Sequence, residues 1–384
     1  MIKVMHITGS MNRGGAEVVI MDLLRNKSSE VHFDFLIHYN RKKGITKGDF
    51  DDEIKTLGAN LFHIPTLWDL GISRYIKELE KIFSAKSPDI VHIHMNSKSG
   101  VIALAAKKAG IRTIITHSHA DIKFRGNKLY TFVANREFWF QKQLIDKYST
   151  QFWGCSTDAC NSLFKKSKRF EFRIINNTVD IEQYQSVTED DVDNFKRKFN
   201  ISENSILLGN VGRIVSHKNI LFIIELLNVL VKKNRNYTFV YAGREDDKAY
   251  HQIVQEKIKE YNLENNVIYL GLRDDVSLIM NVIDVFVGTA LREGFGLVAV
   301  EAQAAGTPSI LYKGFPKTVD MQLGLTNFMD DFTINDWVSA IENVELGKKL
   351  DKDVIKNKIQ VLGFDSANNA KKISELYIEL NGNK

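Results

Sequence analysis

The sequence predicts an α/β protein of two doubly wound parallel-sheet domains. A chain of 384 residues is longer than a single hydrophobic core usually supports, so two domains of about 190 residues each are expected. Short apolar runs that are typical of buried strands alternate with helical patterns, and this order predicts parallel strands with crossover helices. The same succession of strand, glycine-containing turn and helix begins at Lys3 and again at Ile206, so each half is expected to form its own sheet.

The first half is predicted to carry four strands and an early helix. The first strand ends in a glycine-rich turn in which Gly14 and Gly15 lead into the helix Ala16–Arg25. Such a turn can bring backbone N–H groups to a phosphate, but α/β folds also use glycine there for steric reasons alone. The four predicted strands are Lys3–Ile7, Phe33–Ile37, Ile90–His94 and Thr113–Thr116.

The second half repeats this pattern after a boundary that is expected near Asn176–Asp180. A polar helix over Ser186–Asn204 is expected to lie at the edge of this domain. The next predicted elements are the strand that begins at Ile206, the helix Ile220–Val231, the strands Thr238–Ala242, Val267–Leu270 and Val285–Val287, and the helix Val298–Ala305. Gly306 and Pro308 end this last helix, since glycine favours a helix C-terminus and proline cannot continue it. A final helical pattern covers Phe364–Leu380.

The composition is that of an ordinary globular protein, with 44% hydrophobic and 26% charged residues. Two cysteines, Cys155 and Cys160, are too few for a disulfide framework, which favours a reducing cytoplasm, and both are expected to be inert residues on helix faces. The N-terminal apolar stretch is interrupted too early for a secretory signal. The longest apolar run, Ile220–Val231, is far shorter than the roughly 20 residues that a membrane-spanning helix needs, so any membrane contact is expected to be peripheral.

A ligand-binding and catalytic site is predicted in the turn between the strand Val285–Val287 and the helix that follows it. Glu293 lies in this turn, and Glu301 lies more than one turn into the helix. Glycines beside Glu293 allow the backbone to approach a ligand, and the first N–H groups of the helix, near Phe295–Leu297, can donate to oxyanions or hydroxyls. A helical carboxylate such as Glu301 can accept hydrogen bonds from both hydroxyls of a ribose. Either glutamate alone is as readily explained as a solvated residue, so the prediction rests on their combination.

A second candidate feature is the pair of cations Arg213 and Lys218, which flank the turn after the first strand of the second half. Cations at the carboxyl end of a strand, beside a helix N-terminus, are suited to a diphosphate leaving group. The alternative is that both are solvated surface side chains.

No metal site is predicted. Two Asp-x-Asp sequences, Asp49–Asp51 and Asp191–Asp193, lie in polar segments without a leading apolar strand, so both are expected to be solvated helix starts. The histidines, cysteines and acidic residues show no convincing metal-ligand spacing along the sequence.

The sequence E-G-F-G-L-x-x-x-E-A-x-A-x-G-T-P, from Glu293 to Pro308, resembles the E-x7-E signature of the retaining glycosyltransferases of the GT4 family. The resemblance implies the GT-B architecture, in which two facing Rossmann-like domains enclose an interdomain cleft. It implies an acceptor-side domain of residues 1–176 with a returning helix over 364–384, and a nucleotide-sugar-binding domain of residues 177–363. It also implies a metal-independent enzyme without a cofactor, because the nucleotide-sugar donor, expected to be UDP-linked, is a substrate.

Roles for individual residues follow from the resemblance. Arg213 and Lys218 match the positions that stabilise the leaving diphosphate, where they take the place of a metal ion. Glu301 matches the ribose contact, and Arg273 lies in the loop that closes over the nucleobase. The other expected donor contacts are Glu293, Phe295, Gly296 and Leu297 with the sugar hydroxyls, and Gly14 and Gly15 with the diphosphate.

A histidine is expected at the reaction centre. His92, His94, His117 and His119 crowd two strand ends, although a histidine in a strand is more often a satisfied core residue than a catalyst. In the family a histidine at this strand end lies near the anomeric carbon, and His117 matches it by order in T-H-S-H, with His119 as the second choice. The catalytic residues that the resemblance implies are His117, Glu293, Arg213 and Lys218.

The chain departs from the family pattern in three places. Thr178 replaces the glycine of the N-G-V-D hinge. The segment Tyr241–Asp246 lacks the second glycine of the V-G-x-G loop, and Phe315–Lys317 replaces the usual I-P-E, so a further acidic contact is not expected.

A basic and aromatic stretch, Lys123–Arg173, is typical of an anionic membrane surface. It holds eleven Lys and Arg against four Asp and Glu, an excess of +7. Basic residues among aromatic ones suit anionic lipids, whereas the alternative is that aromatics at helical spacing belong to the core. Nucleic acid is not expected as a partner, because no recognised nucleic-acid module accompanies the charge. The densest group of cations is Lys165, Lys166, Lys168 and Arg169.

The expected function is transfer of a hexosyl or N-acetylhexosaminyl group from a nucleotide-diphosphate sugar to a saccharide or lipid-linked saccharide, as in bacterial capsule or exopolysaccharide synthesis. One alternative is a sugar-nucleotide epimerase on the same architecture, which would need acid and base residues for elimination instead of an acceptor site. The other alternative is a non-catalytic, two-lobed protein that binds nucleotide sugars.

Overall fold

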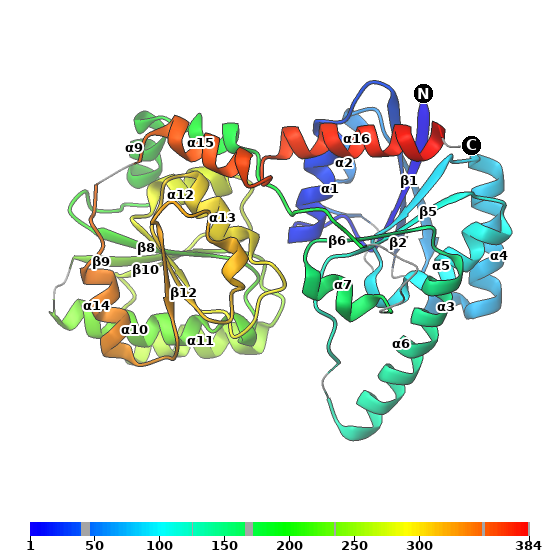
Figure 1. The fold of residues 1–384 in the computed structure, drawn as a ribbon. Coiled ribbons are helices and arrows are strands. Elements are labelled where there is room, and N and C mark those ends of the chain that lie inside the picture. The colour runs from blue at the N-terminus through cyan, green and yellow to red at the C-terminus, as the bar shows by residue number, and fades with distance from the viewer. Residues whose placement is uncertain (40–46, 125, 166–171, 234–235, 348–349, 383–384) are drawn as a thin grey trace. The chain divides into compact units, whose positions relative to one another are not determined.

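The computed structural model describes residues 1–39, 47–124, 126–165, 172–233, 236–347 and 350–382. Contacts divide the chain into two compact units, Met1–Thr178 with Ser366–Lys384, and Val179–Asp365 (Figure 1). Each unit holds one parallel sheet that helices cover, so the predicted α/β class with two doubly wound domains is confirmed. Among the described residues, no helix is both long and apolar enough to cross a bilayer.

The first unit contains a seven-stranded parallel sheet in the order β3-β2-β1-β4-β5-β6-β7. The strand order reverses between β1 and β4, which makes this pair the switch point of a doubly wound sheet. Sequence periodicity did not predict β3, β6 or β7, since β3 and β7 are partly exposed edge strands and β6 is short. The strands are β1 Ile2–Thr8, β2 Val31–Tyr39, β3 Asn60–Pro65, β4 Ile90–Ile93, β5 Thr113–Ser118, β6 Gln151–Gly154 and β7 Arg173–Ile174.

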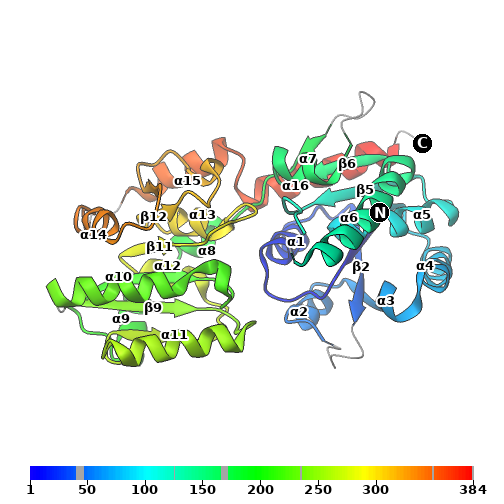
Figure 2. The same cartoon turned by 90° about the horizontal axis from the view of Figure 1, so that it is seen from below.

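Helices cover both faces of this sheet (Figures 1 and 2). The C-terminal helix α16, Ser366–Gly382, belongs to the first unit, where it packs against α1 and places Tyr377 in the core beside Phe33. The other helical elements of the unit are α1 Gly15–Arg25, α2 Asp51–Thr56, α3 Leu67–Leu70, α4 Ile72–Lys86, η2 Asn96–Lys98, α5 Ser99–Lys108, α6 Lys128–Tyr148 and α7 Thr157–Leu163.

The second unit contains a six-stranded parallel sheet in the order β10-β9-β8-β11-β12-β13, with its switch point between β8 and β11. Its strands are β8 Ile206–Val211, β9 Tyr237–Ala242, β10 Val267–Tyr269, β11 Val285–Gly288, β12 Ser309–Tyr312 and β13 Thr326–Met329. The apolar face of α10, Ile220–Lys233, packs against this sheet and against Trp337 of α14. The other helical elements are α8 Ile181–Gln185, α9 Glu189–Lys198, η3 Ser216–Lys218, α11 Lys248–Glu260, α12 Val276–Val282, α13 Leu297–Ala304, η4 Lys317–Val319, α14 Ile334–Glu342 and α15 Lys352–Val361.

The expectation that both Asp-x-Asp sequences are solvated helix starts is wrong for the first of them. Asp51 begins α2 but is buried, because Phe50 and Ile54 on either side of it pack into the core. Asp191 does lie at an exposed helix start, where it forms a capping box with Thr188.

The two cysteines are both buried, but only Cys160 lies on a helix, α7, whereas Cys155 follows β6. Burial raises the pKa of Cys155 to about 11 and that of Cys160 to about 12, so both thiols stay protonated and unreactive at neutral pH.

Candidate functional site

Two loops meet at the switch point of the second sheet. One follows β8 and carries Arg213 and Lys218, and the other follows the adjacent strand β11 and carries Glu293. The buried hydroxyl of Thr289 donates to the carbonyl oxygens of Lys218 at 2.9 Å and Asn219 at 3.1 Å. These hydrogen bonds tie the two loops together, so the R-x4-K and E-x7-E motifs become spatial neighbours. The carboxyl ends of strands at a switch point are where doubly wound sheets bind ligands.

Lys218 and Glu293 form an ion pair between these loops. The Lys218 Nζ donates to the Glu293 Oε1, and the two side chains are only 16% and 14% exposed. Charged side chains that are this little exposed need a partner of opposite charge. The partner of Lys218 among the described residues is the Glu293 carboxylate, and an anionic ligand would compete with that carboxylate for the lysine. The sequence singled out both residues, and the structure adds that they contact each other.

Arg213 lies at the rim of the same edge, with 52% of its side chain exposed. Its Nη1 is 3.4 Å from the Oδ2 of Asp246, and the Oδ1 of the same carboxylate accepts a hydrogen bond from the Nε of Arg244 at 2.8 Å. Asp246 belongs to the loop after β9, and sequence reasoning did not assign it a role. The sequence did contain a sign that this loop is unusual, because Asp246 directly follows the position at which the second glycine of the family pattern is missing.

The loop after β9 keeps the first glycine of the V-G-x-G pattern and has another residue in place of the second. Gly243 has φ +151°, and a Cβ atom there would lie 1.8 Å from the carbonyl oxygen of Gly212, so this position requires glycine. Glu245 stands where the family has the second glycine and does not adopt a positive φ. Its Oε1 instead accepts a hydrogen bond from the Nδ1 of His251 at 2.7 Å. At this position the chain therefore has an ordinary backbone conformation and a side chain that forms a hydrogen bond.

His217 is a further residue of this site that sequence reasoning missed. It is exposed next to Lys218, and its backbone carbonyl accepts a hydrogen bond from the N–H of Leu291 at 2.8 Å. Partial loss of contact with water, followed by the charges of Lys218 and Arg213, lowers the pKa of His217. Arg292 also lowers it, whereas Glu293 raises it, so three permanent cations surround this histidine. The group favours an anion with several oxygens, such as a diphosphate.

The helix α13 begins in a conformation that needs glycine. Gly296 is its N-cap with φ +84°, and a Cβ atom there would lie 2.6 Å from the ring of Phe315. The side chains of Phe295 and Leu297 are buried, and Phe295 stacks on Phe364 with 5.6 Å between the ring centroids. Only the backbone of this segment can therefore serve the predicted contact with sugar hydroxyls.

Glu301 lies on the partly exposed stripe of α13, one turn after Val298. The residues around it, Ala299, Val300 and Ala302, are buried. The helix thus presents Glu301 as its one charged side chain.

Arg273, the residue predicted near the nucleobase, has a partner within its own loop. Its Nε donates to the Oδ1 of Asp275 at 2.8 Å, its Nη2 donates to Oδ2, and the guanidinium lies 5.8 Å from the ring centroid of Phe199. The hydrogen bonds to Asp275 raise the pKa of Arg273. The bidentate contact sets the direction of this side chain.

Gly14 and Gly15 lie in the first unit, after β1, where Gly14 is the N-cap of α1. Asp49, the first residue of the sequence Asp49–Asp51, contacts this turn. Its Oδ2 accepts a hydrogen bond from the N–H of Arg13 at 2.9 Å. Apart from the adjacent residues and the backbone of α1 itself, no atom of the described residues lies within 4 Å of the position that a Cβ of Gly15 would take.

His117 and His119 lie at the carboxyl end of β5, both buried. The Nδ1 of His117 is 3.2 Å from the Nε2 of His92, and the Nε2 of His119 is 2.8 Å from the Nδ1 of His94. The other nitrogens of the two rings, Nε2 of His117 and Nδ1 of His119, have no hydrogen-bond partner in the described part of the chain. Neither histidine has hydrogen bonds at both ring nitrogens, as a purely structural core histidine would. The expectation that His117, or else His119, lies at the reaction centre stays a prediction.

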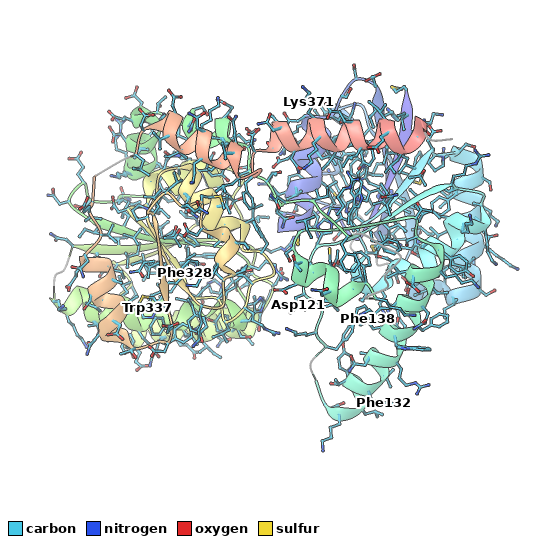
Figure 3. All side chains as sticks on the ribbon, viewed as in Figure 1. Asp121, Phe132, Phe138, Phe328, Trp337 and Lys371 are labelled. Carbon is cyan, nitrogen blue, oxygen red and sulfur yellow. The ribbon has the colours of Figure 1, made fainter. Side chains whose placement is uncertain are left out.

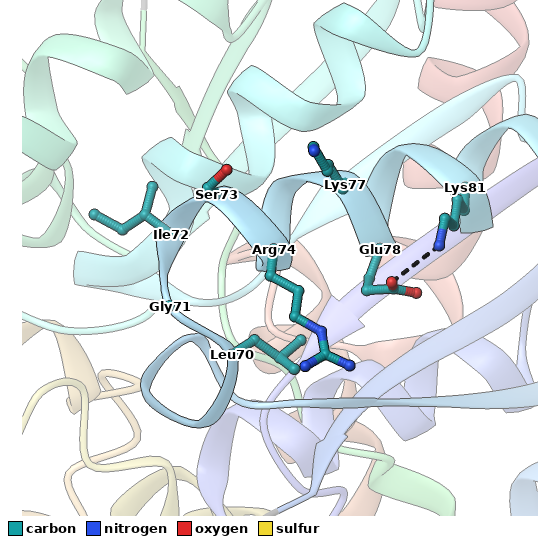
Figure 4. A pocket seen from close by; sticks show the side chains of 8 residues that line it. All are labelled: Leu70, Gly71, Ile72, Ser73, Arg74, Lys77, Glu78 and Lys81. Carbon is teal, nitrogen blue, oxygen red and sulfur yellow. Dashed lines mark hydrogen bonds and ion pairs between the residues drawn. The ribbon is translucent and has the colours of Figure 1, made fainter.

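A shallow hollow over α3 and α4 contains none of the predicted site residues (Figure 4). Its side chains include Arg74, Lys77 and Lys81, and Lys81 donates to Glu78 at 3.1 Å. It is a charged, solvated surface on the first unit.

Two family models match the chain: "Glycosyl transferases group 1" over residues 191–361 and "Glycosyl transferase 4-like" over residues 42–146. The chain is 29% identical to EpsF of Bacillus subtilis (strain 168), which is named as a glycosyltransferase, over 98% of this chain and 96% of that one. It is 24% identical to the UDP-Gal:alpha-D-GlcNAc-diphosphoundecaprenol alpha-1,3-galactosyltransferase of Escherichia coli, over 100% of this chain and 98% of the relative.

The crystal structure of HepE of Anabaena in complex with UDP and glucose matches the fold with a TM-score of 0.76 at 18% identity, over 99% of this chain and 100% of that one. The predicted GT-B fold class is thereby confirmed, and these matches favour neither the epimerase nor the non-catalytic alternative. Both domain matches and the relatives that align along nearly the whole chain show that this protein belongs to the GT4-like, group 1 glycosyltransferases, which transfer a sugar from a nucleotide-sugar donor to an acceptor.

Proposed function

We propose that this enzyme transfers a hexosyl or N-acetylhexosaminyl group from a UDP-linked donor, with retention and without a metal ion, to a saccharide or lipid-linked saccharide of a bacterial surface polysaccharide. The observation that carries the proposal is the ion pair of Lys218 and Glu293, which joins two loops at the switch point of the second sheet. The E. coli relative supports the donor and acceptor classes, because its name states UDP-Gal and a GlcNAc linked to diphosphoundecaprenol.

In this proposal the leaving diphosphate takes the place of Glu293 beside Lys218. The diphosphate gains negative charge as the glycosidic bond breaks, and Lys218 and Arg213 supply fixed positive charge at that point. The displaced Glu293, with the backbone of Phe295–Leu297, then faces the donor sugar. Glu301 accepts hydrogen bonds from the ribose, and His117 serves the reaction centre.

The reaction is tested by incubating the protein with a panel of sugar nucleotides and following them by mass spectrometry. Transfer to an added saccharide, or slow hydrolysis of one donor, is expected. A free epimer would identify an epimerase, and donor binding without any turnover would identify a binding protein, so either result overturns the proposal.

The two glutamates are expected to respond differently to substitution. Glu301→Gln is expected to raise the Michaelis constant for the donor about tenfold with little change in turnover, because a ribose contact is the same in ground state and transition state. Glu293→Gln is expected mainly to lower turnover, because Glu293 lies closer to the bonds that change. Steady-state kinetics with both variants measures this difference, and equal effects on both constants would contradict the two roles.

We further propose peripheral attachment to the cytoplasmic face of an anionic membrane through the first unit. Only some aromatic residues of the stretch Lys123–Arg173 are exposed. Phe152, Trp153 and Phe164 are buried, as expected if aromatic residues of this stretch belong to the core. Of the predicted cation cluster, Lys166, Lys168 and Arg169 lie outside the described residues. The exposed apolar residues of the stretch lie instead on α6, namely Leu129, Tyr130, Phe132, Val133, Trp139 and Phe140.

The apolar residues of α6 are arranged as in a helix that lies in a lipid interface. Leu129, Phe132, Val133 and Phe140 share one face at helical spacing, together with the cation Arg136. Phe132 and Trp139 are 60% and 64% exposed. The N-terminal part of α6 extends away from the sheet, and Phe132 lies near its tip (Figures 1 and 3). Side chains of this size are rarely left in water without a partner surface.

Replacing Phe132 and Trp139 together by serine is expected to abolish binding to anionic vesicles in a co-sedimentation assay. The wild-type protein should bind anionic but not neutral vesicles and should be released by high salt, because the cations act through the lipid charge. Val361→Ser is the matched control, since Val361 is 82% exposed on α15 of the other unit and should not affect binding. Indifference of the wild type to lipid charge would contradict the attachment and favour a soluble acceptor.

A further inference from the structure

Five histidines form one buried cluster at the switch point of the first sheet. His6 of β1 pairs in register with His92 of β4, and His117 lies on the next strand, β5. His94 and His119 follow two residues after His92 and His117, so their side chains are on the same face of the sheet. We call these five residues the histidine cluster.

Ring nitrogens of the histidine cluster lie close together. The Nδ1 of His6 is 3.0 Å from the Nε2 of His94, and the Nδ1 of His94 is 2.8 Å from the Nε2 of His119. One nitrogen from each of His94, His117 and His119 lies within 4.8 Å of the other two, and the same holds for His6, His92 and His94. Two imidazole nitrogens that bind one zinc ion at about 2.0–2.1 Å lie less than about 4.2 Å apart, so small rotations of these rings would let three of them reach one ion.

The rings of the histidine cluster have no acidic partner. Within the described residues no carboxylate pairs with any of the five rings, and the Nδ1 of His92 is 2.7 Å from the hydroxyl of Tyr377. A histidine ring that no carboxylate holds can offer a nitrogen to a metal ion.

Three nitrogens of the histidine cluster are buried without a partner in the described chain, namely Nε2 of His6, Nε2 of His117 and Nδ1 of His119. A buried polar atom without a hydrogen bond is destabilising, so such atoms in a native protein point to an unseen ligand. Two of the three belong to His117 and His119. These residues, with His94, lie at the carboxyl edge of the sheet, whereas His6 and His92 lie deeper.

We propose that His94, His117 and His119 bind one late first-row divalent cation, with zinc as the best match. Zinc prefers imidazole nitrogens at about 2.0–2.1 Å in a tetrahedral arrangement, which leaves a fourth position for water or an anion. Magnesium and calcium prefer oxygen ligands and are not expected here. This inference goes beyond the proposed transfer reaction and does not depend on it. Because His117 is shared with the predicted reaction centre, bound zinc would withdraw that ring from catalysis.

The test is titration of the full-length chain, purified without a polyhistidine tag, with CoCl₂ and ZnCl₂. We expect one ion per chain by calorimetry, and an intense visible absorption band with Co²⁺, which reports tetrahedral coordination. MgCl₂ should produce no heat and no rise in thermal unfolding temperature, whereas ZnCl₂ should raise it. His94→Gln, His117→Gln and His119→Gln are each expected to weaken Zn²⁺ binding 10- to 100-fold or more. His63→Gln, at a partly exposed histidine of β3, is the control and should bind like the wild type.

Unchanged Zn²⁺ affinity in the three variants would overturn the proposal. So would loss of binding in His6→Gln and His92→Gln with normal binding in His117→Gln, because that result assigns the ion to the deeper group. If a variant does not fold, X-ray absorption of the zinc-loaded wild type decides the question. Three coordinated imidazoles are expected, and one or none would overturn the site.

Discussion

Lys218→Ala is expected to lower turnover by about 100- to 1,000-fold, with a much smaller change in the Michaelis constant for the donor. Lys218 is less exposed than Arg213 and is placed to face the negative charge that the leaving diphosphate gains in the transition state. Removal of one fixed hydrogen-bond donor from such a position typically lowers turnover by this factor. Arg213→Ala is expected to cost a similar order of magnitude. Mg²⁺ or Mn²⁺ should not rescue either variant, and full recovery with a divalent ion would contradict a metal-free reaction.

The loss in Lys218→Ala has to be separated from the cost of leaving Glu293 without its partner. The double variant Lys218→Ala with Glu293→Gln removes that unpaired charge, so it should recover stability in thermal unfolding but not turnover. Lys233→Ala is the matched control, because Lys233 also pairs with a glutamate of the second unit, Glu342, at 2.9 Å, and lies away from the loops. Its activity should equal that of the wild type.

Gly243→Ala is expected to destabilise the second unit by about 3 kcal/mol or more and to weaken UDP binding at least tenfold. A methyl group at this position would collide with the carbonyl oxygen of Gly212, and φ is +151°. The loop would have to move, which would break the hydrogen bond from the N–H of Gly243 to the carbonyl of Gly271. It would also shift Asp246 away from Arg213. Thermal unfolding and titration calorimetry with UDP measure the two effects.

Gly271→Ala separates the collision from backbone strain alone. Gly271 also has a positive φ, +70°, but within the described part of the chain no atom other than those of its two neighbours lies within 4 Å of its Cβ position. This variant is expected to lose about 1–2 kcal/mol, the cost of a left-handed conformation for alanine. Equal losses in the two variants would show that the contact between Gly243 and Gly212 has no role.

The features that depend on local order were predictable from the sequence. Strand and helix alternate along the chain, so β1, β8, β10 and β11 and the helices α1, α10 and α13 lie within a few residues of the predicted ranges. Hydrophobic periodicity is a local property of the sequence, so it predicts these elements without knowledge of any long-range contact. The motifs around Glu293 and Lys218 are local too, which is why they identified the family.

The features that depend on side-chain environment were not predictable. Asp51 looked solvated in a polar segment, but its neighbours Phe50 and Ile54 pack into the core and bury it. Aromatic residues of one basic stretch separated into buried core residues and exposed residues of α6, because burial depends on what packs against each side chain. The buried and the exposed aromatic residues belong to one stretch, so its composition could not distinguish them.

By itself, the sequence determined the doubly wound class, the glycosyltransferase family and the two loops that carry its motifs, because each is encoded in short stretches of neighbouring residues. Only the tertiary structure decided which distant residues meet. Sheet order placed β8 beside β11 and so paired Lys218 with Glu293, and it placed β1, β4 and β5 side by side and so assembled the histidine cluster. Parallel strands bring their carboxyl ends to one edge whatever their separation in sequence, and no spacing along the chain reveals that arrangement.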